Sequence, residues 1–328
     1  MRHLLKLISG ARRLFLLLLA LPGCVLNAQA WPDRPIRLVV PYPPGAMGDT
    51  LARMLSERMQ PALGQPVIVE NRAGAGGNIG AASVAKPGGD GHTFLIAATN
   101  NLVINQHLYP NMPFDPLKAL QPVTMLVDVP SAIFVHAKVP ANTLQAFMQH
   151  AKAHPGGVNY ASPGSGTTVH IFSEALNQRH GLHMMHVPYK GAAQALTAVL
   201  GEEVQMLAIG AGVGAPHVRT GKLRMLAISG SHRSSAFPDV PTFAQAGLHD
   251  IVASNWWAVA APADMPADTV QRFRDELARA MTQPGIAQRL QELGAVPVLN
   301  TPGEMALQLQ REALFWGQMV RETRVKLD

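Results

Sequence analysis

The sequence predicts an α/β fold organised in two domains, and three observations lead to this prediction. From residue 36 onward, short runs of β-branched and apolar residues alternate with segments of helical periodicity, as in βαβ units around parallel sheets. The chain has 328 residues, a length typical of two domains or one large one. Its composition, with 48% hydrophobic and 15% charged residues, is that of a folded rather than a disordered chain.

The first thirty residues predict a targeting signal rather than part of the fold. Four basic residues precede an apolar run at 14–21, and Ala28-Gln29-Ala30 supplies a small-x-small cleavage site. The apolar run is too short to span a membrane as a helix. We expect Sec-type export to the periplasm with cleavage after Ala30. The alternative is a lipoprotein acylated at Cys24, although Pro22 fits the lipobox pattern poorly.

Removal of this signal changes what the charge of the chain implies. The formal net charge is +6, but the segment carries four basic residues and no acidic one, which leaves +2 after cleavage. A charge this small disfavours a nucleic-acid partner. Cys24 is the single cysteine in the sequence, so a disulfide scaffold or a cysteine-based metal cluster is excluded.

The elements of the first part of the chain follow in order from residue 36. A buried strand at 36–40 leads through a Pro- and Gly-rich turn into a helix with Asp49 as N-cap, which Pro61 kinks or ends. Further elements are predicted as a strand at 67–69, a Gly-rich turn at 73–77, a helix at 78–86 and a strand at 93–98.

The second part of the chain continues the alternation and ends in two helices. The apolar residues at 270, 273, 277 and 281 recur at helical spacing, and Thr301 with Glu304 forms a capping-box sequence with Pro at the first helical position. Additional strands are predicted near 133–136, 158–161, 184–187, 204–209 and 224–229.

Two segments have the pattern of crossings between the domains. They lie at 123–130 and 252–262, the second containing a Trp-Trp pair. We therefore expect a discontinuous first domain of residues 31–130 and 251–328, and a second domain of residues 131–250.

The candidate motifs for catalysis or metal binding in this sequence are all incomplete. The Gly-rich run at 74–80 lacks Gly-x-Gly-x-x-Gly spacing, and no Walker A or Gly-x-Ser-x-Gly sequence occurs. His150 and His154 are spaced for one helix face, and His180, His183 and His186 follow at intervals of three, but no acidic partner lies near either group. We expect no catalytic residues, no metal and no cofactor. An exported enzyme that processes carboxylates would need a converging acid, base or metal, so the sequence predicts no enzyme.

Polar loops follow three of the predicted strands. They cover 43–49, 99–101 and 162–168 and are rich in Gly, Ser, Thr and Asn but contain no Lys or Arg. In open parallel sheets, ligands bind beyond the carboxyl ends of the strands, where helix N-termini present unpaired N–H groups and a positive partial charge. The loops therefore predict a carboxylate site, and the alternative is that they are only tight turns and caps.

Six motifs spread over the chain carry a family resemblance. They are Trp-Pro-Asp-Arg-Pro-Ile-Arg-Leu-Val-Val-Pro-Tyr-Pro-Pro-Gly at 31–45 with Asp49, Leu-Gly-Gln-Pro-Val at 63–67, Val-Glu-Asn-Arg-Ala-Gly-Ala-Gly-Gly-Asn-Ile-Gly at 69–80, Asn-Tyr-Ala-Ser at 159–162, His-Val-Pro-Tyr-Lys-Gly at 186–191 and Pro-Asp-Val-Pro-Thr at 238–242. Together they resemble the Bug family, the extracytoplasmic solute receptors of tripartite tricarboxylate transporters.

The resemblance implies a type II-like periplasmic binding protein with two lobes, each a mostly parallel sheet flanked by helices, and a cleft between them. It implies a small organic carboxylate as ligand: a di- or tricarboxylate, an acidic amino acid or an aromatic acid. The implied partners are the membrane subunits of a tripartite transporter or, alternatively, a sensor kinase, and the receptor is expected to be a monomer.

The resemblance also implies which residues bind the ligand. Ala46 stands where the family usually has a second glycine, and Gly48 stands where Thr or Ser is common, so the ligand itself stays open. Asp49 has two candidate roles, as helix cap or as partner of an ammonium group. The implied binding residues are Pro44, Gly45, Ala46, Met47, Gly48 and Asp49; Thr99, Asn100 and Asn105; Ser162, Gly164, Ser165, Gly166, Thr167 and Thr168; and Gly210 and Ala211.

Overall fold

The computed structural model describes residues 31–249 and 255–327. The expected signal segment and part of the second expected crossing therefore lie outside the described residues. All named helices and strands belong to one compact unit, Arg34–Asp328. Within the described residues, no helix is both long and apolar enough to cross a membrane.

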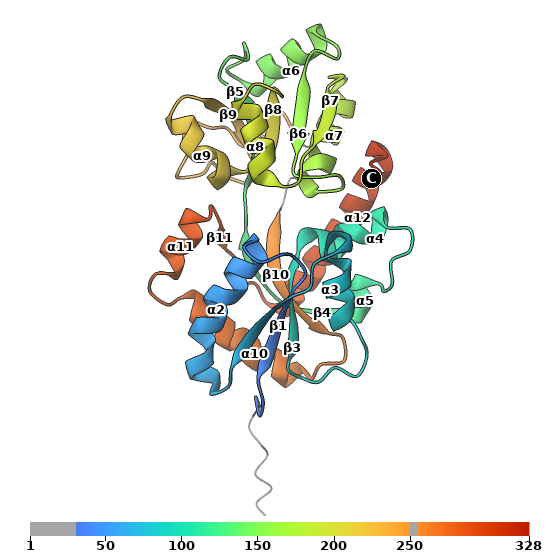
Figure 1. The fold of residues 1–328 in the computed structure, drawn as a ribbon, viewed down its shortest axis with the longest axis vertical. Helices are drawn as coiled ribbons and strands as arrows, with labels where there is room; N and C mark the ends of the chain where they lie inside the picture. The colour runs from blue at the N-terminus through green and yellow to red at the C-terminus, as the bar shows by residue number, and fades with distance from the viewer. Residues whose placement is uncertain (1–30, 250–254, 328) are drawn as a thin grey trace, which may run out of the picture. The chain divides into compact units, whose positions relative to one another are not determined.

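Two sheets organise this unit into two lobes (Figure 1). The first has six strands in the order β11-β4-β10-β3-β1-β2, and the second has five in the order β7-β6-β8-β5-β9. Their bounds are β1 (Ile36–Val40), β2 (Val67–Asn71), β3 (Thr93–Ala98), β4 (Leu120–Asp128), β10 (Trp256–Pro262) and β11 (Val296–Pro297) in the first sheet, and β5 (Ser131–His136), β6 (Asn159–Ser162), β7 (Met185–Pro188), β8 (Met206–Gly210) and β9 (Leu223–Ile228) in the second.

The two-lobed α/β architecture is as expected, but the sheets are mixed rather than mostly parallel. Each contains three parallel strands, β2-β1-β3 or β7-β6-β8, followed by one antiparallel strand, β10 or β5. Strand β5 comes directly from β4 of the other lobe. A strand that enters from the opposite lobe runs against its neighbours, which explains the mixed pairing. The strands of the six-stranded sheet lie before residue 130 or after residue 250, and those of the five-stranded sheet lie between these positions. We propose residues 130 and 250 as the domain boundaries.

Helices cover both faces of each sheet. Their bounds are α2 (Met47–Leu63), η1 (Ala75–Gly77), α3 (Asn78–Val84), η2 (Asn100–Ile104), α4 (Asn105–Leu108), α5 (Pro116–Ala119), α6 (Leu144–Ala153), α7 (Thr168–His180), α8 (Ala192–Leu200), α9 (Ala211–Arg219), α10 (Ala267–Met281), α11 (Ile286–Glu292) and α12 (Pro302–Thr323).

Alternation along the strands divides the core of each lobe into two layers. In β5, Ile133 and Val135 pack in the cluster that contains residues of α6 and α7, whereas Ala132 and Phe134 pack with α8. In β3, Leu95 and Ala97 pack against α3 and α12. On the opposite face, the ring of Phe94 stacks on Phe273 of α10 with centroids 3.7 Å apart.

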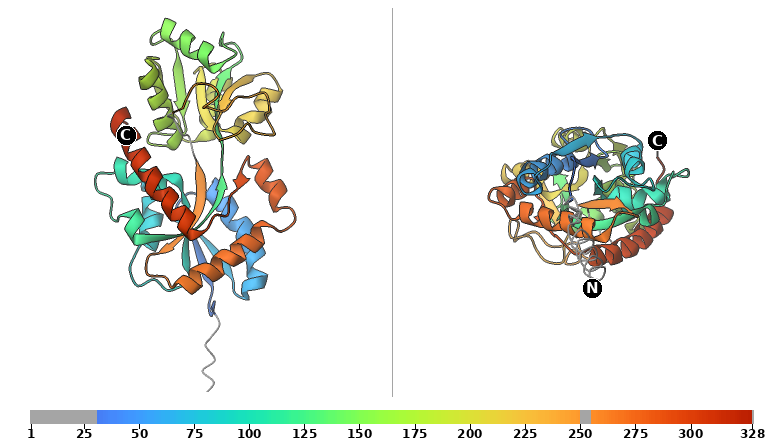
Figure 2. Two further views of the ribbon diagram at one scale, coloured as in Figure 1. Left: turned by 180° about the vertical axis from the view of Figure 1, so that it is seen from behind. Right: turned by 90° about the horizontal axis from the view of Figure 1, so that it is seen from below.

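The C-terminal helix α12 contacts both lobes, as Figure 2 shows from behind. Met319 of this helix shares one buried cluster with Ile171 of α7 and with the core of the six-stranded lobe. Gln178 donates to the Thr323 carbonyl at 2.9 Å, and Arg179 pairs with Glu322 at 2.6 Å. The helix therefore joins the lobes beside the crossing strands.

Two helix ends can be compared with their sequence prediction. The capping box is confirmed, since Thr301 Oγ1 accepts from the Glu304 amide and Glu304 accepts from the Thr301 amide. Asp49 as N-cap is wrong: α2 begins at Met47. Pro61 lies within α2 and does not end it, since the helix continues to Leu63 and ends at Gly64 with φ +66°.

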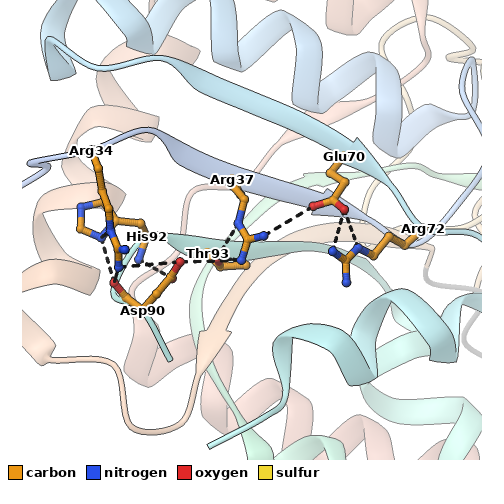
Figure 3. Close-up of polar contacts among 7 residues, drawn as sticks. All are labelled: Arg34, Arg37, Glu70, Arg72, Asp90, His92 and Thr93. Carbon is orange, nitrogen blue, oxygen red and sulfur yellow. Dashed lines mark hydrogen bonds and ion pairs between the residues drawn. The ribbon is translucent and has the colours of Figure 1, made fainter. Parts of the chain in front are cut away.

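Charged side chains link the strands at the β2 edge of the six-stranded sheet (Figure 3). Arg37 of β1 donates to Thr93 Oγ1 at 2.9 Å and lies 3.7 Å from the carboxylate of Asp90 and 4.0 Å from that of Glu70. Arg72 pairs with Glu70 at 2.6 Å. These side chains are about one-third or more exposed, so the network adds little to stability.

Candidate functional site

A cavity of about 310 Å³ lies where loops of the two lobes meet. It opens beyond the carboxyl ends of β1, β3, β6 and β8, the edge at which ligands bind in open α/β sheets. Its lining residues are Tyr42, Ala46, Met47, Ala98, Asn100, Val129, Pro163, Thr167, Thr168, Val169, Ala192, Ile209, Gly210, Val213, Asn255, Trp257 and Leu293.

Four helices begin at the wall of this cavity. Ala46 is the N-cap of α2, Thr167 that of α7 and Gly210 that of α9, while Ala192 is the first residue of α8. The amides of a first helical turn have no acceptor within the helix, and the helix dipole adds a positive partial charge there. Four such ends around one cavity favour an anion.

Among the described residues, 31–249 and 255–327, those that line the cavity include no Asp, Glu, Lys, Arg or His. Tyr42 is its one titratable group, and burial raises the pKa of this phenol far above its ordinary value of 10. The neutral hydroxyl donates to Asn101 Oδ1 at 3.3 Å. An anion here would be held by amide dipoles and uncharged polar side chains.

The first turn, at 43–49, is fixed by a carboxylate behind the wall. Asp49, 4% exposed, accepts from the Gly45 amide at 2.9 Å and from Arg53 Nε at 3.0 Å. The Arg53 guanidinium lowers the pKa of Asp49, with the Gly45 amide adding to the effect. Asp49 is thus neither the helix cap nor a lining residue. It braces the turn that presents Ala46 and Met47 to the cavity.

The second turn, at 162–168, is fixed by two histidines. The imidazoles of His170 and His186 stack with centroids 3.7 Å apart. His170 Nδ1 accepts from the Gly166 amide at 3.0 Å, and His186 Nε2 lies 2.7 Å from Ser162 Oγ. Thr167 Oγ1 closes the turn by donating to the Gly164 carbonyl at 2.8 Å. These contacts hold the N-terminus of α7 against the cavity.

One side-chain contact ties this turn to the other lobe. Asn100 Nδ2, at the start of η2, donates to the Gly166 carbonyl at 3.0 Å. Thr99 instead bonds the backbone of Trp256, where its Oγ1 accepts from the amide at 2.9 Å. Asn105 donates to Asn78 Oδ1 at 2.7 Å and is 2% exposed. Of these three predicted residues, only Asn100 lines the cavity.

The predicted binding residues divide into a lining set and a supporting set. Those that line the cavity are Ala46, Met47, Asn100, Thr167, Thr168 and Gly210. Those that lie outside its lining are Pro44, Gly45, Gly48, Asp49, Thr99, Asn105, Ser162, Gly164, Ser165, Gly166 and Ala211.

Sequence reasoning missed most of the apolar wall and both bracing histidines. Trp257, Ile209 and Val213 have the sequence pattern of core residues, and only the fold brings them to the cavity. His186 belongs to the motif at 186–191 and to a histidine group spaced for a metal, and neither pattern indicates its place behind the turn. Among the described residues, no three His, Cys, Asp or Glu side chains gather in a way that could hold a metal ion.

Comparison with known proteins identifies the family. Residues 51–325 match the model of the tripartite tricarboxylate transporter family receptor. Protein BugT of Bordetella pertussis (strain Tohama I) is 37% identical over 303 residues, covering 92% of this chain and 93% of BugT.

Two solved structures of Rhodopseudomonas palustris proteins are also similar. Rpa4515 with adipate has a TM-score of 0.79 and 28% identity, covering 91% of this chain and all of the other. MatC (Rpa3494) with bound malate has a TM-score of 0.76 and 30% identity, covering 88% of this chain and all of the other. This chain belongs to the tripartite tricarboxylate transporter receptor family, whose members are solute-binding receptors and not enzymes.

Proposed function

We propose that this protein captures a small organic carboxylate in the interlobe cavity and delivers it to the membrane subunits of a tripartite tricarboxylate-type transporter. The observation that carries the proposal is the meeting of four helix N-termini at one cavity. The adipate and malate in the two R. palustris structures support a carboxylate as ligand.

The carboxylate is proposed to lie between the turns at 43–49 and 162–168. The first-turn amides of α2 and α7, together with Asn100 and Thr168, would donate hydrogen bonds to its oxygens. The buried residues of the predicted set, such as Asp49 and Ser162, would act by holding the turns in place. Because donors come from both lobes, the bound anion would favour a closed arrangement of the lobes.

The proposed location is the periplasm, since residues 1–30 have the pattern of an export signal. A monomeric receptor that presents its ligand-bound state to a membrane sensor kinase is the alternative to a transporter partner. Pull-down of the ligand-loaded protein with detergent-solubilised transporter subunits or with the sensor domain would separate the two.

The carboxylate site is tested by thermal unfolding of the protein cut before Trp31. We expect one class of mono-, di- or tricarboxylate to raise the midpoint, because ligand at 100 times its Kd adds about 2.7 kcal/mol of stability. Ala46→Asp should abolish this shift. It places a negative charge at the cavity while providing a side-chain cap that α2 lacks, so the fold should be as stable as before.

Ala46→Asn is the matched control for this variant. It has the size and capping ability of Asp without the charge, so it should keep at least part of the ligand shift. Equal ligand shifts in the Asp and Asn variants would contradict the placement of the anion. The absence of any shift across the panel would contradict the carboxylate proposal itself.

A further inference from the structure

Gly48 and Trp257 are in unusually close contact beside the cavity. Gly48 is the second residue of α2, and Trp257 lies in β10. A Cβ built on Gly48 would lie 2.3 Å from Cζ3 and 2.9 Å from Cε3 of the Trp257 ring. Because Cβ atoms do not approach other atoms so closely, the indole can occupy this place only while residue 48 has no side chain. The indole therefore packs against the first turn of the helix at Gly48.

Trp257 forms an aromatic wall together with Tyr42. Their ring centroids are 5.3 Å apart and their planes are inclined by 70°, the edge-to-face arrangement that aromatic pairs prefer. Both residues line the cavity. The hydroxyl of Tyr42 is held by Asn101, and Trp257 is 8% exposed, so the wall is well packed on its outer side.

The rest of the described wall is mainly apolar. Val169, Ile209 and Val213 contribute from the five-stranded lobe, and Met47 and Leu293 from the six-stranded lobe. The polar side chains of the described lining, besides the Tyr42 hydroxyl, are Asn100, Thr167, Thr168 and Asn255. These few hydrogen-bond donors, with the helix N-termini, are enough to bind one carboxylate. A second carboxylate would lose its hydration without meeting a cation among the described lining residues.

We propose that Gly48 and Trp257 make this receptor selective for monocarboxylates with a flat aromatic body, with the ligand ring against the indole and its carboxylate at the helix N-termini. The proposal rests on the carboxylate-receptor function and specifies its substrate class. Aromatic contacts of this kind favour an aromatic ring over a saturated ring of the same size by about three- to tenfold in Kd.

The first experiment compares four acids by isothermal titration calorimetry: benzoate, cyclohexanecarboxylate, adipate and malate. We expect benzoate to bind about three- to tenfold more tightly than cyclohexanecarboxylate, and at least about tenfold more tightly than either dicarboxylate. Trp257→Leu should remove the preference for benzoate over cyclohexanecarboxylate, whereas Trp257→Phe should keep most of it.

The second experiment tests the contact between the two residues. Gly48→Ser should displace the indole and weaken benzoate binding by roughly tenfold or more. The same substitution in a Trp257→Leu background should have a much smaller effect, because the displaced ring is already absent. Gly303→Ser is the matched control: Gly303 is also the second residue of a helix, and a Cβ there would meet nothing within 4 Å. Its melting temperature reports the cost of serine at that helix position alone.

The outcomes separate this inference from the function on which it rests. If adipate or malate binds at least as tightly as benzoate, the aromatic class is wrong and the carboxylate receptor stands. If benzoate binds best but Gly48→Ser and Trp257→Leu act additively, the assignment to this residue pair is wrong. If none of the four acids binds but another carboxylate raises the thermal midpoint, the aromatic class is wrong and the carboxylate receptor stands. If no carboxylate binds in either experiment, the carboxylate-receptor proposal fails as well.

Discussion

Asp49 lies behind the first turn of the cavity wall, where its negative charge is paired with the guanidinium of Arg53. Arg53 lies within 3.0 Å of it and lowers the pKa of the carboxyl group, so the side chain is ionised at neutral pH. The paired charge is directed to Arg53 and to the Gly45 amide. Asp49 therefore holds the turn of the proposed anion site in place. Because its charge is paired with Arg53, its repulsion of a bound anion is largely cancelled.

His170 and His186 have the corresponding role behind the second turn. A ring nitrogen that accepts from the Gly166 amide must be unprotonated, which fixes the proton of neutral His170 on Nε2. The ring of His170 in turn stacks on that of His186, with centroids 3.7 Å apart. These residues position the turn without reaching the cavity.

Gly166 lies within the second turn, and its carbonyl accepts from Asn100. It has φ +75°, and an added Cβ would lie 2.5 Å from Leu327 Cδ2 and 3.1 Å from Leu108 Cδ1. Gly166→Ala should therefore lower stability by about 1–3 kcal/mol through backbone strain and overpacking, and should weaken ligand binding by displacing the turn. Chemical denaturation and ligand titration measure the two effects.

Gly156 is the matched control for this substitution. It has φ +72°, but a Cβ there would meet nothing within 4 Å. Gly156→Ala should show the backbone penalty without the packing penalty or the loss of binding. Equal losses of stability in both variants would mean that Leu327 and Leu108 yield freely, contrary to this account.

At the level of elements, helix α12 holds the first residues of β10 through the partly buried carboxylate of Glu312. Trp256 Nε1 donates to Glu312 Oε2 at 2.8 Å, and Gln308 donates to Oε1 at 2.7 Å. Burial raises the pKa of Glu312 in spite of these hydrogen bonds. Trp257, the next residue of β10, belongs to the cavity wall, so α12 fixes part of the site from outside.

This arrangement predicts the pH dependence of one substitution. A carboxyl group with a raised pKa in the folded state costs stability as the pH rises from its ordinary value of 4.5 through the folded value. The free energy of unfolding of Glu312→Gln, relative to that of the wild type, should therefore be higher at pH 8 than at pH 4. Unfolding in guanidinium chloride at the two pH values measures this difference.

Glu322 on the same helix gives the control of opposite sign. Its pKa is lowered by the hydrogen bond and charge of Arg179, so its contribution to stability is present above 4.5 and is lost as the pH falls. The free energy of unfolding of Glu322→Gln, relative to that of the wild type, should be lower at pH 8 than at pH 4. The same trend in both variants would contradict the assignment of the two environments.

At the scale of the whole molecule, a shared core joins the two lobes. The cluster that contains Trp256 and Trp316 also contains Ile171 and Ala175 of α7. Lobes that share buried contacts unfold together more readily than lobes joined by linkers alone. All four tryptophans lie outside the five-stranded sheet and the helices that cover it, at 31, 256, 257 and 316, so tryptophan fluorescence does not report that lobe directly.

Thermal unfolding should therefore give one transition. We expect the midpoints from tryptophan fluorescence and from far-ultraviolet circular dichroism, which reports both lobes, to coincide. Ile171→Ala should separate them by weakening the shared cluster. Leu176→Ala, on the same helix but in a cluster confined to the five-stranded lobe, should weaken that lobe and leave the midpoints together. Separate midpoints in the unmodified protein would contradict this coupling.

Local pattern predicted most of the strands well. The strand at 93–98 matches β3 residue for residue, and the capping box at Thr301 is formed as expected, because alternation and capping act over a few residues. The errors lie where distant segments decide. The sheets are mixed because β5 and β10 enter antiparallel from the opposite lobe.

The sequence by itself determined the α/β class, the positions of most strands and of several helices, the polar turns that follow the strands, and, through its motifs, the family. Tertiary structure alone decided which members of those turns reach the cavity. It brought Trp257 against Gly48 and placed His170 and His186 behind the second turn. The physical reason is range: caps, turns and periodicity depend on neighbours in the chain, whereas a cavity is made by side chains from segments more than a hundred residues apart, whose apolar members have the sequence pattern of ordinary core residues.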